Sequence, residues 1–362
     1  MKNFSKNLLS EKFLFFRLSA RDQILFIKRL SFLIKAGVPI LDSLQMIQEQ
    51  TRSRGYSRIL RSVVEDVSNG QYLSLSLSKH KSFSDFSVHM IHVGETAGML
   101  SENLEYLALE LNKKQILKRK VVSAFIYPII VTIATFGITG FLMVYLFPKI
   151  IPVFSSLRID LPFSTRVVIF ISNLINDYGL LIILGIFVFT SSIFIAMKKS
   201  RSLHFYFDKC LLKIFGIGQI IQYYNLANAT RTMGLLLKSG ITISEAVPIV
   251  SHASVNLVYK KEFFNLSQTI NRGENISKYF MSRSSFFPEI LAQVISVGER
   301  SGSLSSAFIY VSELYESEVD DFTKNLSTLI EPILMICMGL LVGFIAISII
   351  TPIYSITQNL NG

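Results

Sequence analysis

Val93-Gly94-Glu95-Thr96-Ala97-Gly98-Met99-Leu100 returns later in the chain as Val297-Gly298-Glu299-Arg300-Ser301-Gly302-Ser303-Leu304. Both copies read V-G-E-x-x-G-x-L. In each copy an apolar helical pattern meets two glycines and a new helical pattern follows, and a glycine can adopt the positive φ that ends a helix and reverses the chain. The motif therefore predicts a corner between two helices. Because no second acidic residue recurs near both copies, we expect its glycines and glutamates to be structural: Gly94, Glu95, Gly98, Gly298, Glu299 and Gly302.

An internal duplication surrounds these two corners. With an offset of 204 residues Pro128 meets Pro332 and Pro148 meets Pro352, and with one residue of slippage 33–37 lies over 236–240. Self-similarity at a fixed period is the signature of a repeated structural unit. We therefore expect two copies of one helical plan.

The composition indicates a membrane protein. Half of the 362 residues are apolar, only 17% are charged and the mean hydropathy is +0.46. The net charge of +11 is spread through amphipathic patterns and beside apolar runs, so it favours contact with a membrane surface over direct binding of nucleic acid. Cys210 and Cys337 are the only cysteines, and they do not support a disulfide framework.

Long uncharged runs divide the chain into domains and spans. The run 121–147 has no charge, and as a helix it would rise about 40 Å, enough to cross a hydrocarbon core of roughly 30 Å. The predicted organisation is an N-terminal lead at 1–20, a helical domain at 21–120, spans at 121–147, 178–197 and 326–353, a loop at 148–177, a second helical domain at 198–325 and a tail at 354–362.

Basic residues flank the spans asymmetrically, which predicts their orientation. Lysines and arginines gather at 113–120 before the first span and at 198–201 after the second, and cytoplasmic flanks carry such an excess. We therefore expect the N-terminus and both helical domains in the cytoplasm, with the loop and the tail in the periplasm. The span 178–197 has no counterpart in the other repeat and is needed to return the chain to the cytoplasm.

The last span contains the candidate functional residues. Glu331 is its only charge, and an ionisable group within a span is a candidate functional residue, although a place near the headgroups would also suit it. Pro332 follows it. Gly339 and Gly343 form a G-x-x-x-G pattern that allows helices to approach closely.

We expect no catalytic, cofactor-binding or metal-binding site. The chain has no G-x-x-x-x-G-K-[ST] phosphate loop and no H-E-x-x-H motif. His89 and His92 are spaced with Glu95 as metal ligands on a helix can be, but Gln293 and Ser296 replace them in the second copy.

Together these residues resemble one family, the secretion F family of inner-membrane platform proteins in type IV pilus and type II secretion machines. The resemblance covers nearly the whole chain. It rests on the A/S-G-x-x-x-x-[DE] segments 36–42 and 239–245, the two corners, Tyr127-Pro128, Leu161-Pro162, Thr165-Arg166, Glu331-Pro332, Gly339, Gly343 and Pro352.

The resemblance implies an all-α, multi-pass, non-enzymatic scaffold of the bacterial inner membrane. It implies contact with a cytoplasmic assembly ATPase, with pilin or pseudopilin subunits and with other inner-membrane assembly proteins, and a homo-oligomeric state. Two other classes stay open from the residues alone. A small-solute transporter or channel would need polar groups that these aliphatic spans provide poorly, and a membrane-bound enzyme would need a clustered acid, base and nucleophile.

Overall fold

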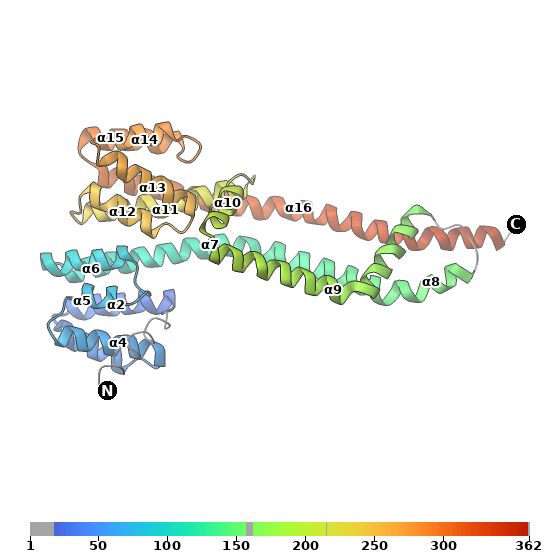
Figure 1. The fold of residues 1–362 in the computed structure, drawn as a ribbon, viewed down its shortest axis with the longest axis horizontal. Helices are drawn as coiled ribbons and strands as arrows, with labels where there is room; N and C mark the ends of the chain where they lie inside the picture. Colours follow the sequence, from blue (N-terminus) through green and yellow to red (C-terminus); the bar gives the residue numbers. More distant parts are fainter. Residues whose placement is uncertain (1–17, 157–161, 215, 361–362) are drawn as a thin grey trace. The chain divides into compact units, whose positions relative to one another are not determined.

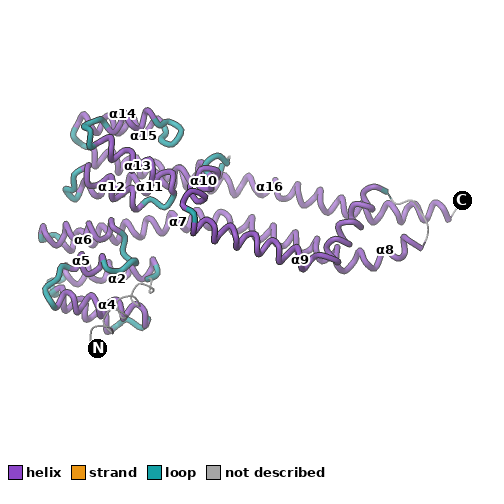
Figure 2. Tube along the Cα trace, in the orientation of Figure 1, coloured by secondary structure: helices purple, strands orange, loops and turns teal. Residues whose placement is uncertain are grey.

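The computed structural model describes residues 18–156, 162–214 and 216–360 (Figure 1). Within these ranges the regular structure is helical and includes no strand (Figure 2), which confirms the all-α fold class. Residues 1–17 of the predicted lead and 361–362 of the predicted tail lie outside the described residues.

The two repeats contain the same helices in the same order. The first consists of α2 (Ala20–Lys35), α3 (Ile40–Glu49), α4 (Arg54–Ser68), α5 (Leu73–Ser78), α6 (Asp85–Ala97) and α7 (Leu100–Phe141). The second consists of α11 (Ile217–Lys238), α12 (Ile243–Ala253), α13 (Leu257–Ile270), α14 (Ile276–Ser282), α15 (Glu289–Ser301) and α16 (Leu304–Leu360). Between them lie the π-helical turn η2 (Leu142–Leu146), α8 (Phe147–Ser156), α9 (Phe163–Lys199) and α10 (Arg201–Leu211).

The chain folds into two compact units. One consists of Met1–Arg119 with Asp208–Asp320, and therefore contains the helical bundles of both repeats. The other consists of Lys120–Phe207 with Asp321–Gly362, and contains the apolar helices.

Local capping and apolar spacing explain why the bundle helices form. Ser19 caps α2 by accepting a hydrogen bond from the backbone N–H of Asp22 (3.1 Å), and Thr242 begins α12 with a capping box. On α2 the buried residues Phe26, Ile27 and Leu30 follow helical spacing and face the core. Packing of such faces, more than helix propensity, holds short helices in place.

The predicted loop at 148–177 needs correction because most of it is helical. α8 includes 148–156, and α9 starts at Phe163, well before the span predicted at 178–197. Two prolines of this segment stand where a helix tolerates them, since Pro162 is the N-cap of α9 and Pro148 is the second residue of α8, next to the π-turn; Pro152 lies inside α8.

Three helices of the described chain are long and apolar enough to cross a membrane: Leu100–Pro152, Phe163–Met197 and Leu304–Pro352. The first two contain the predicted spans 121–147 and 178–197, and the third includes residues 326–352 of the predicted span 326–353. Many of their large apolar side chains are exposed, Leu180 and Leu340 among them, as expected for helices whose apolar solvent is lipid.

Pro148 leaves a backbone carbonyl for α9 to bind. In η2 the N–H of Phe147 donates to the carbonyl of Leu142, five residues earlier. In the same register the next carbonyl, that of Met143, would accept from residue 148. Residue 148 is a proline, which has no N–H to donate. The buried hydroxyl of Ser172 donates to Met143 O at 2.6 Å, and the side-chain amide of Asn176 lies 3.5 Å from the same oxygen. The unpaired acceptor created by the proline is thereby satisfied.

Pro352, the duplicate of Pro148, also leaves a backbone carbonyl of its own helix without a donor, and α9 again supplies one. It cannot donate to the carbonyl of Ser348, four residues earlier, and the buried hydroxyl of Thr165 donates to that oxygen at 2.8 Å. Thr165 and Ser172 are seven residues apart on α9, about two helical turns, and so lie on one face. The unrepeated helix therefore binds the carbonyls freed by both duplicated prolines.

Candidate functional site

The bundles of the two repeats contact each other through different faces. The first repeat contributes α6 and α7, and the second contributes α11 and α12. The ammonium of Lys238 lies 4.9 Å from the ring centroid of Tyr106, and the hydroxyl of Ser239 donates to the sulfur of Met90 at 3.3 Å. This interface joins the repeats within the bundle unit.

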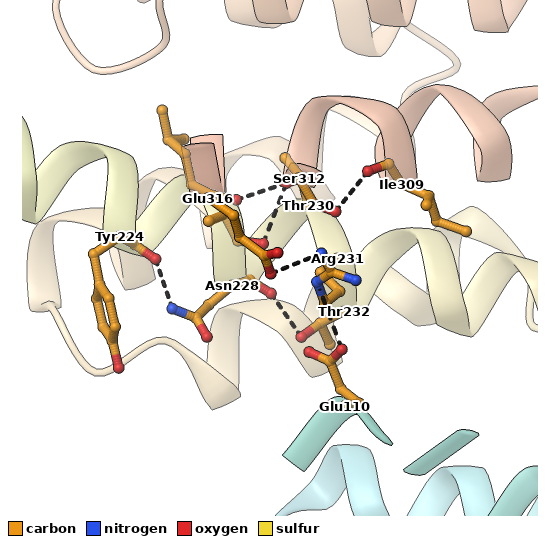
Figure 3. A network of polar contacts seen from close by, with 11 residues as sticks. Glu110, Tyr224, Asn228, Thr230, Arg231, Thr232, Ile309, Ser312 and Glu316 are labelled. Carbon is orange, nitrogen blue, oxygen red and sulfur yellow. Dashed lines mark hydrogen bonds and ion pairs between the residues drawn. The ribbon is translucent and has the colours of Figure 1, made fainter. Parts of the chain in front are cut away.

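A buried arginine of this interface lies between two glutamates (Figure 3). Arg231 of α11 has a side chain only 7% exposed, and its Nη2 lies 2.7 Å from Oε1 of Glu316 on α16. Its Nε lies 3.7 Å from Oε2 of Glu110 on α7, whose side chain is 5% exposed. Neither nitrogen has a hydrogen-bond acceptor among the described residues, so the contacts are ionic. One guanidinium thereby lies against an acid from each repeat, and burial, which outweighs the attraction of Arg231, raises the pKa of Glu110 to about 7.

The corner glutamates bind the start of another helix. Glu95 accepts hydrogen bonds from the backbone N–H groups of Leu73 and Ser74, the first two residues of α5. In the second repeat Glu299 accepts from the N–H groups of Ile276 (2.6 Å) and Ser277 (3.2 Å), the first two of α14. The hydroxyls of both serines donate to the same carboxylates. Each glutamate therefore satisfies N–H groups that a helix leaves unpaired at its start.

The two glycines of each corner have different structural roles. Gly98 and Gly302 have φ of 71° and 68°, in the left-handed region, where they end α6 and α15. Gly94 and Gly298 are helical, but a Cβ built on them would come within 3.0 Å and 2.6 Å of the following helix. One glycine reverses the chain, and the other allows the two helices to approach closely.

Glu331 and Pro332 lie inside α16, within the apolar helix of the second unit. The Glu331 side chain is exposed and makes no hydrogen bond or ion pair with the part of the chain that the structure describes. The structure therefore leaves this carboxylate accessible to something outside the described chain.

Gly339 is exposed and Gly343 is half-buried. A Cβ built on either glycine would meet no atom of the described chain within 4 Å. The G-x-x-x-G pattern thus makes no close helix contact there, and helix packing at these glycines stays a proposal that needs a further partner.

The histidines suggested by spacing have other surroundings. His92 Nδ1 lies 3.3 Å from the hydroxyl of Ser74, and its ring contacts Tyr72 edge to face. Among the described residues no group of three or more His, Cys, Asp or Glu side chains lies close enough to hold a metal ion.

Sequence reasoning missed Arg231 and Ser172, and it named Thr165 only as part of the family motif, without the contact that its hydroxyl makes. A signal for Arg231 was present, because it is a lone charge within the otherwise uncharged stretch 217–237. The two hydroxyl residues gave no such signal, since serine and threonine are ordinary in apolar helices and their acceptors lie far away in sequence.

A sequence model of one family, type II secretion system (T2SS) protein F, matches this chain twice, over residues 26–148 and 229–352. The two matches include more than half of the chain. The chain belongs to this family. The double match supports the duplication independently, because each match begins within α2 or α11 and ends at one of the duplicated prolines, Pro148 or Pro352.

Named relatives in the protein F family come from two kinds of machine. The chain is 30% identical over 343 residues to the type IV pilus assembly protein PilC of Thermus thermophilus, and this alignment includes 94% of the chain and 84% of the relative. It is 29% identical over 336 residues to PilC of Pseudomonas aeruginosa, with 92% and 90% included. It is 28% identical over 342 residues to the type II secretion system protein F of the same organism, with 94% and 84% included. Family membership and the three apolar helices indicate a multi-pass protein of the inner membrane.

Proposed function

We propose that this protein is a non-enzymatic platform of the bacterial inner membrane that couples a cytoplasmic assembly ATPase to the insertion of pilin or pseudopilin subunits into a growing fibre. The observation that supports this most strongly is the double protein F match, together with relatives named for pilus assembly and type II secretion. The choice between a pilus and a secretion machine is left to the experiment below.

The bundle unit suits a scaffold because its two repeats are tied together by a buried charge. If the contact broke, the carboxylate of Glu110 or the guanidinium of Arg231 would be buried without a partner, and the free energy of the folded bundle would rise. A rotation of one repeat against the other is thereby opposed. A partner that binds one repeat will therefore transmit force to the other.

Within this function we propose that Glu331 receives the subunit. Subunits of this class enter assembly with an apolar N-terminal helix bearing a free amine, as the family resemblance implies. An accessible carboxylate in an apolar helix attracts such an amine more strongly than water would allow, because the local dielectric constant is low. The duplicate position of Glu331 is Tyr127, so the two repeats are not equivalent toward the subunit.

A complementation experiment tests this proposal. The gene is deleted in the source organism, and surface fibres and secreted protein are measured after return of the wild-type gene, of Glu331→Gln or of the matched control Asp177→Asn. Asp177 is an exposed acid of another apolar helix, α9. We expect wild type and the control to restore assembly, and Glu331→Gln to fail at equal membrane levels. Normal fibres and secretion in the deletion strain would contradict the platform function, whereas normal assembly by Glu331→Gln would contradict only the role of the charge.

The proposed orientation is tested separately. A reporter active only in the periplasm is fused after Asn265, in α13 of the second bundle, and another after Phe163, at the start of α9. The cytoplasmic placement predicts an inactive first fusion and an active second one. The reverse result would invert the topology.

A further inference from the structure

A groove between α2 and α7 of the first repeat carries positive charge that the described chain does not neutralise. Its volume is about 810 Å³, and its basic lining residues are Arg21, Lys28, Lys35 and Arg119. Among its described lining residues the one acid is Glu105, which already pairs with Lys35 at 2.8 Å. The side chains of Arg21, Lys28 and Arg119 are exposed and make no hydrogen bond or ion pair with the described part of the chain. These three cations are therefore available to an anion from outside.

The second repeat neutralises the corresponding charge by itself. The duplication pairs Lys28 with Arg231, and Asn112 of the same groove with Glu316. Arg231 Nη2 lies 2.7 Å from Glu316 Oε1, and the arginine side chain is only 7% exposed. In the first repeat an uncharged amide stands in place of that acid, and Lys28 stays exposed. The first repeat thus keeps the cation and lacks the internal anion.

The other two free cations are also particular to the first repeat. The duplicate of Arg21 is Tyr224, and the duplicate of Arg119 is Thr323. Neither replacement carries a positive charge. At all three duplicated positions, 21, 112 and 119, the first repeat is therefore more positive than the second. Such a one-sided difference is expected where only the first repeat binds an external anion.

The two arginines lie at the end of the groove from which α7 continues into its apolar run. Lys35 and Glu105 pair at the opposite end, and Arg21 and Arg119 line the same groove at fourteen residues, roughly 21 Å, from that pair along their own helices. Arg119 is two residues, about 3 Å along the helix, before the uncharged run 121–147. The arginine end therefore meets the membrane surface.

We propose that the arginine end of this groove binds the phosphate of an anionic phospholipid in the adjacent leaflet. A guanidinium donates parallel hydrogen bonds that fit phosphate oxygens, and Arg21 and Arg119 provide two such groups. Phospholipid phosphates are the anions concentrated where α7 enters its apolar run, and basic pockets beside spans are typical of headgroup sites. The inference depends on the apolar helices and stands independently of the proposed function.

Native mass spectrometry of the full-length protein in detergent tests the site. The protein is titrated with phosphatidylglycerol and, in separate arms, with zwitterionic phosphatidylcholine or with inorganic phosphate. The fraction of protein that carries one added molecule is counted at each concentration. We expect saturable binding of phosphatidylglycerol, and no saturable binding of phosphatidylcholine or of inorganic phosphate in the same range.

Two double variants separate this site from general surface charge. Arg21→Gln with Arg119→Gln should weaken phosphatidylglycerol binding by roughly 30-fold, since each basic residue near a membrane surface contributes about 1 kcal/mol. The matched control is Lys199→Gln with Arg201→Gln, which removes two exposed basic residues at the end of α9 and the start of α10. The control should bind phosphatidylglycerol as tightly as the wild type.

A third variant gives the first repeat the acid of the second without removing a cation. Asn112→Glu introduces a carboxylate beside Lys28, as Glu316 lies beside Arg231, and should weaken phosphatidylglycerol binding by roughly tenfold, whereas Asn112→Gln should not. Wild-type affinity in the double arginine variant or in Asn112→Glu would overturn the inference. Equal binding of phosphatidylcholine or inorganic phosphate would do so too, as would no lipid binding at all, the result expected if an acidic protein segment filled the groove.

Discussion

Replacement of the buried Arg231 by methionine is the sharpest test of how the repeats are held together. The substitution keeps an unbranched side chain but removes the cation that lies between Glu110 and Glu316. Because the side chains of these acids are 5% and 26% exposed, water can replace the lost partner only in part. The expected loss of unfolding free energy is roughly 3–5 kcal/mol, as for other broken buried ion pairs.

The assay is thermal unfolding of the detergent-purified full-length protein, followed by circular dichroism. A loss of about 1 kcal/mol lowers the melting temperature of a unit of this size by about 2–4 °C, so the bundle transition should fall by roughly 6–20 °C. The matched control is Lys35→Met. Its ion pair with Glu105 is as short, at 2.8 Å, but both side chains are more than half exposed, so water screens the pair and its removal should leave the melting temperature close to that of the wild type.

A compensated variant separates charge from packing. Arg231→Met combined with Glu110→Gln and Glu316→Gln leaves no uncompensated carboxylate at the interface, so most of the lost stability should return. If Arg231→Met alone melted within about 2 °C of the wild type, the buried ion pairs would not hold the repeats together. If the triple variant melted as low as the single one, lost packing would be the cause instead.

Three further predictions each concern one polar side chain. Glu95→Ala should destabilise the first bundle by roughly 1–3 kcal/mol in thermal unfolding, because two N–H groups at the start of α5 lose their acceptor; an unchanged melting temperature would refute that capping role. Ser172→Ala should weaken the packing of α9 by roughly 1 kcal/mol, measured as loss of helicity at a lower concentration of denaturing detergent. Thr190→Ala is the control and should leave that concentration unchanged, because the Thr190 hydroxyl bonds only within its own helix. Burial lowers the pKa of His80 below its usual 6.5, so the imidazole binds a proton more readily in the unfolded chain than in the folded one. The free energy of unfolding should therefore decline as the pH falls below about 6.5. His80→Gln should remove that part of the decline, and an unchanged pH profile of stability in this variant would contradict the role of His80.

The sequence by itself determined the helical plan, the duplication, the corners and the apolar spans. These features are local: a helix period, a glycine at a reversal and an uncharged run each depend on residues within a few turns of one another. V-G-E-x-x-G-x-L could therefore be recognised as a corner before any contact was known. The same locality produced the error at 148–177, where the ends of the uncharged runs predicted the ends of the helices although α8 and α9 extend beyond them.

The tertiary structure decided which partner each polar group meets. Glu95 binds the start of a helix that lies 21 and 22 residues earlier, Arg231 joins carboxylates from both repeats, and Thr165 binds a carbonyl 183 residues away. No periodicity encodes such pairs, since a carboxylate or a hydroxyl has the same identity whether it faces water, a helix start or a carbonyl freed by proline. The physical reason is that burial makes an unpaired polar group costly, and only the folded chain determines which group is close enough to pair with it.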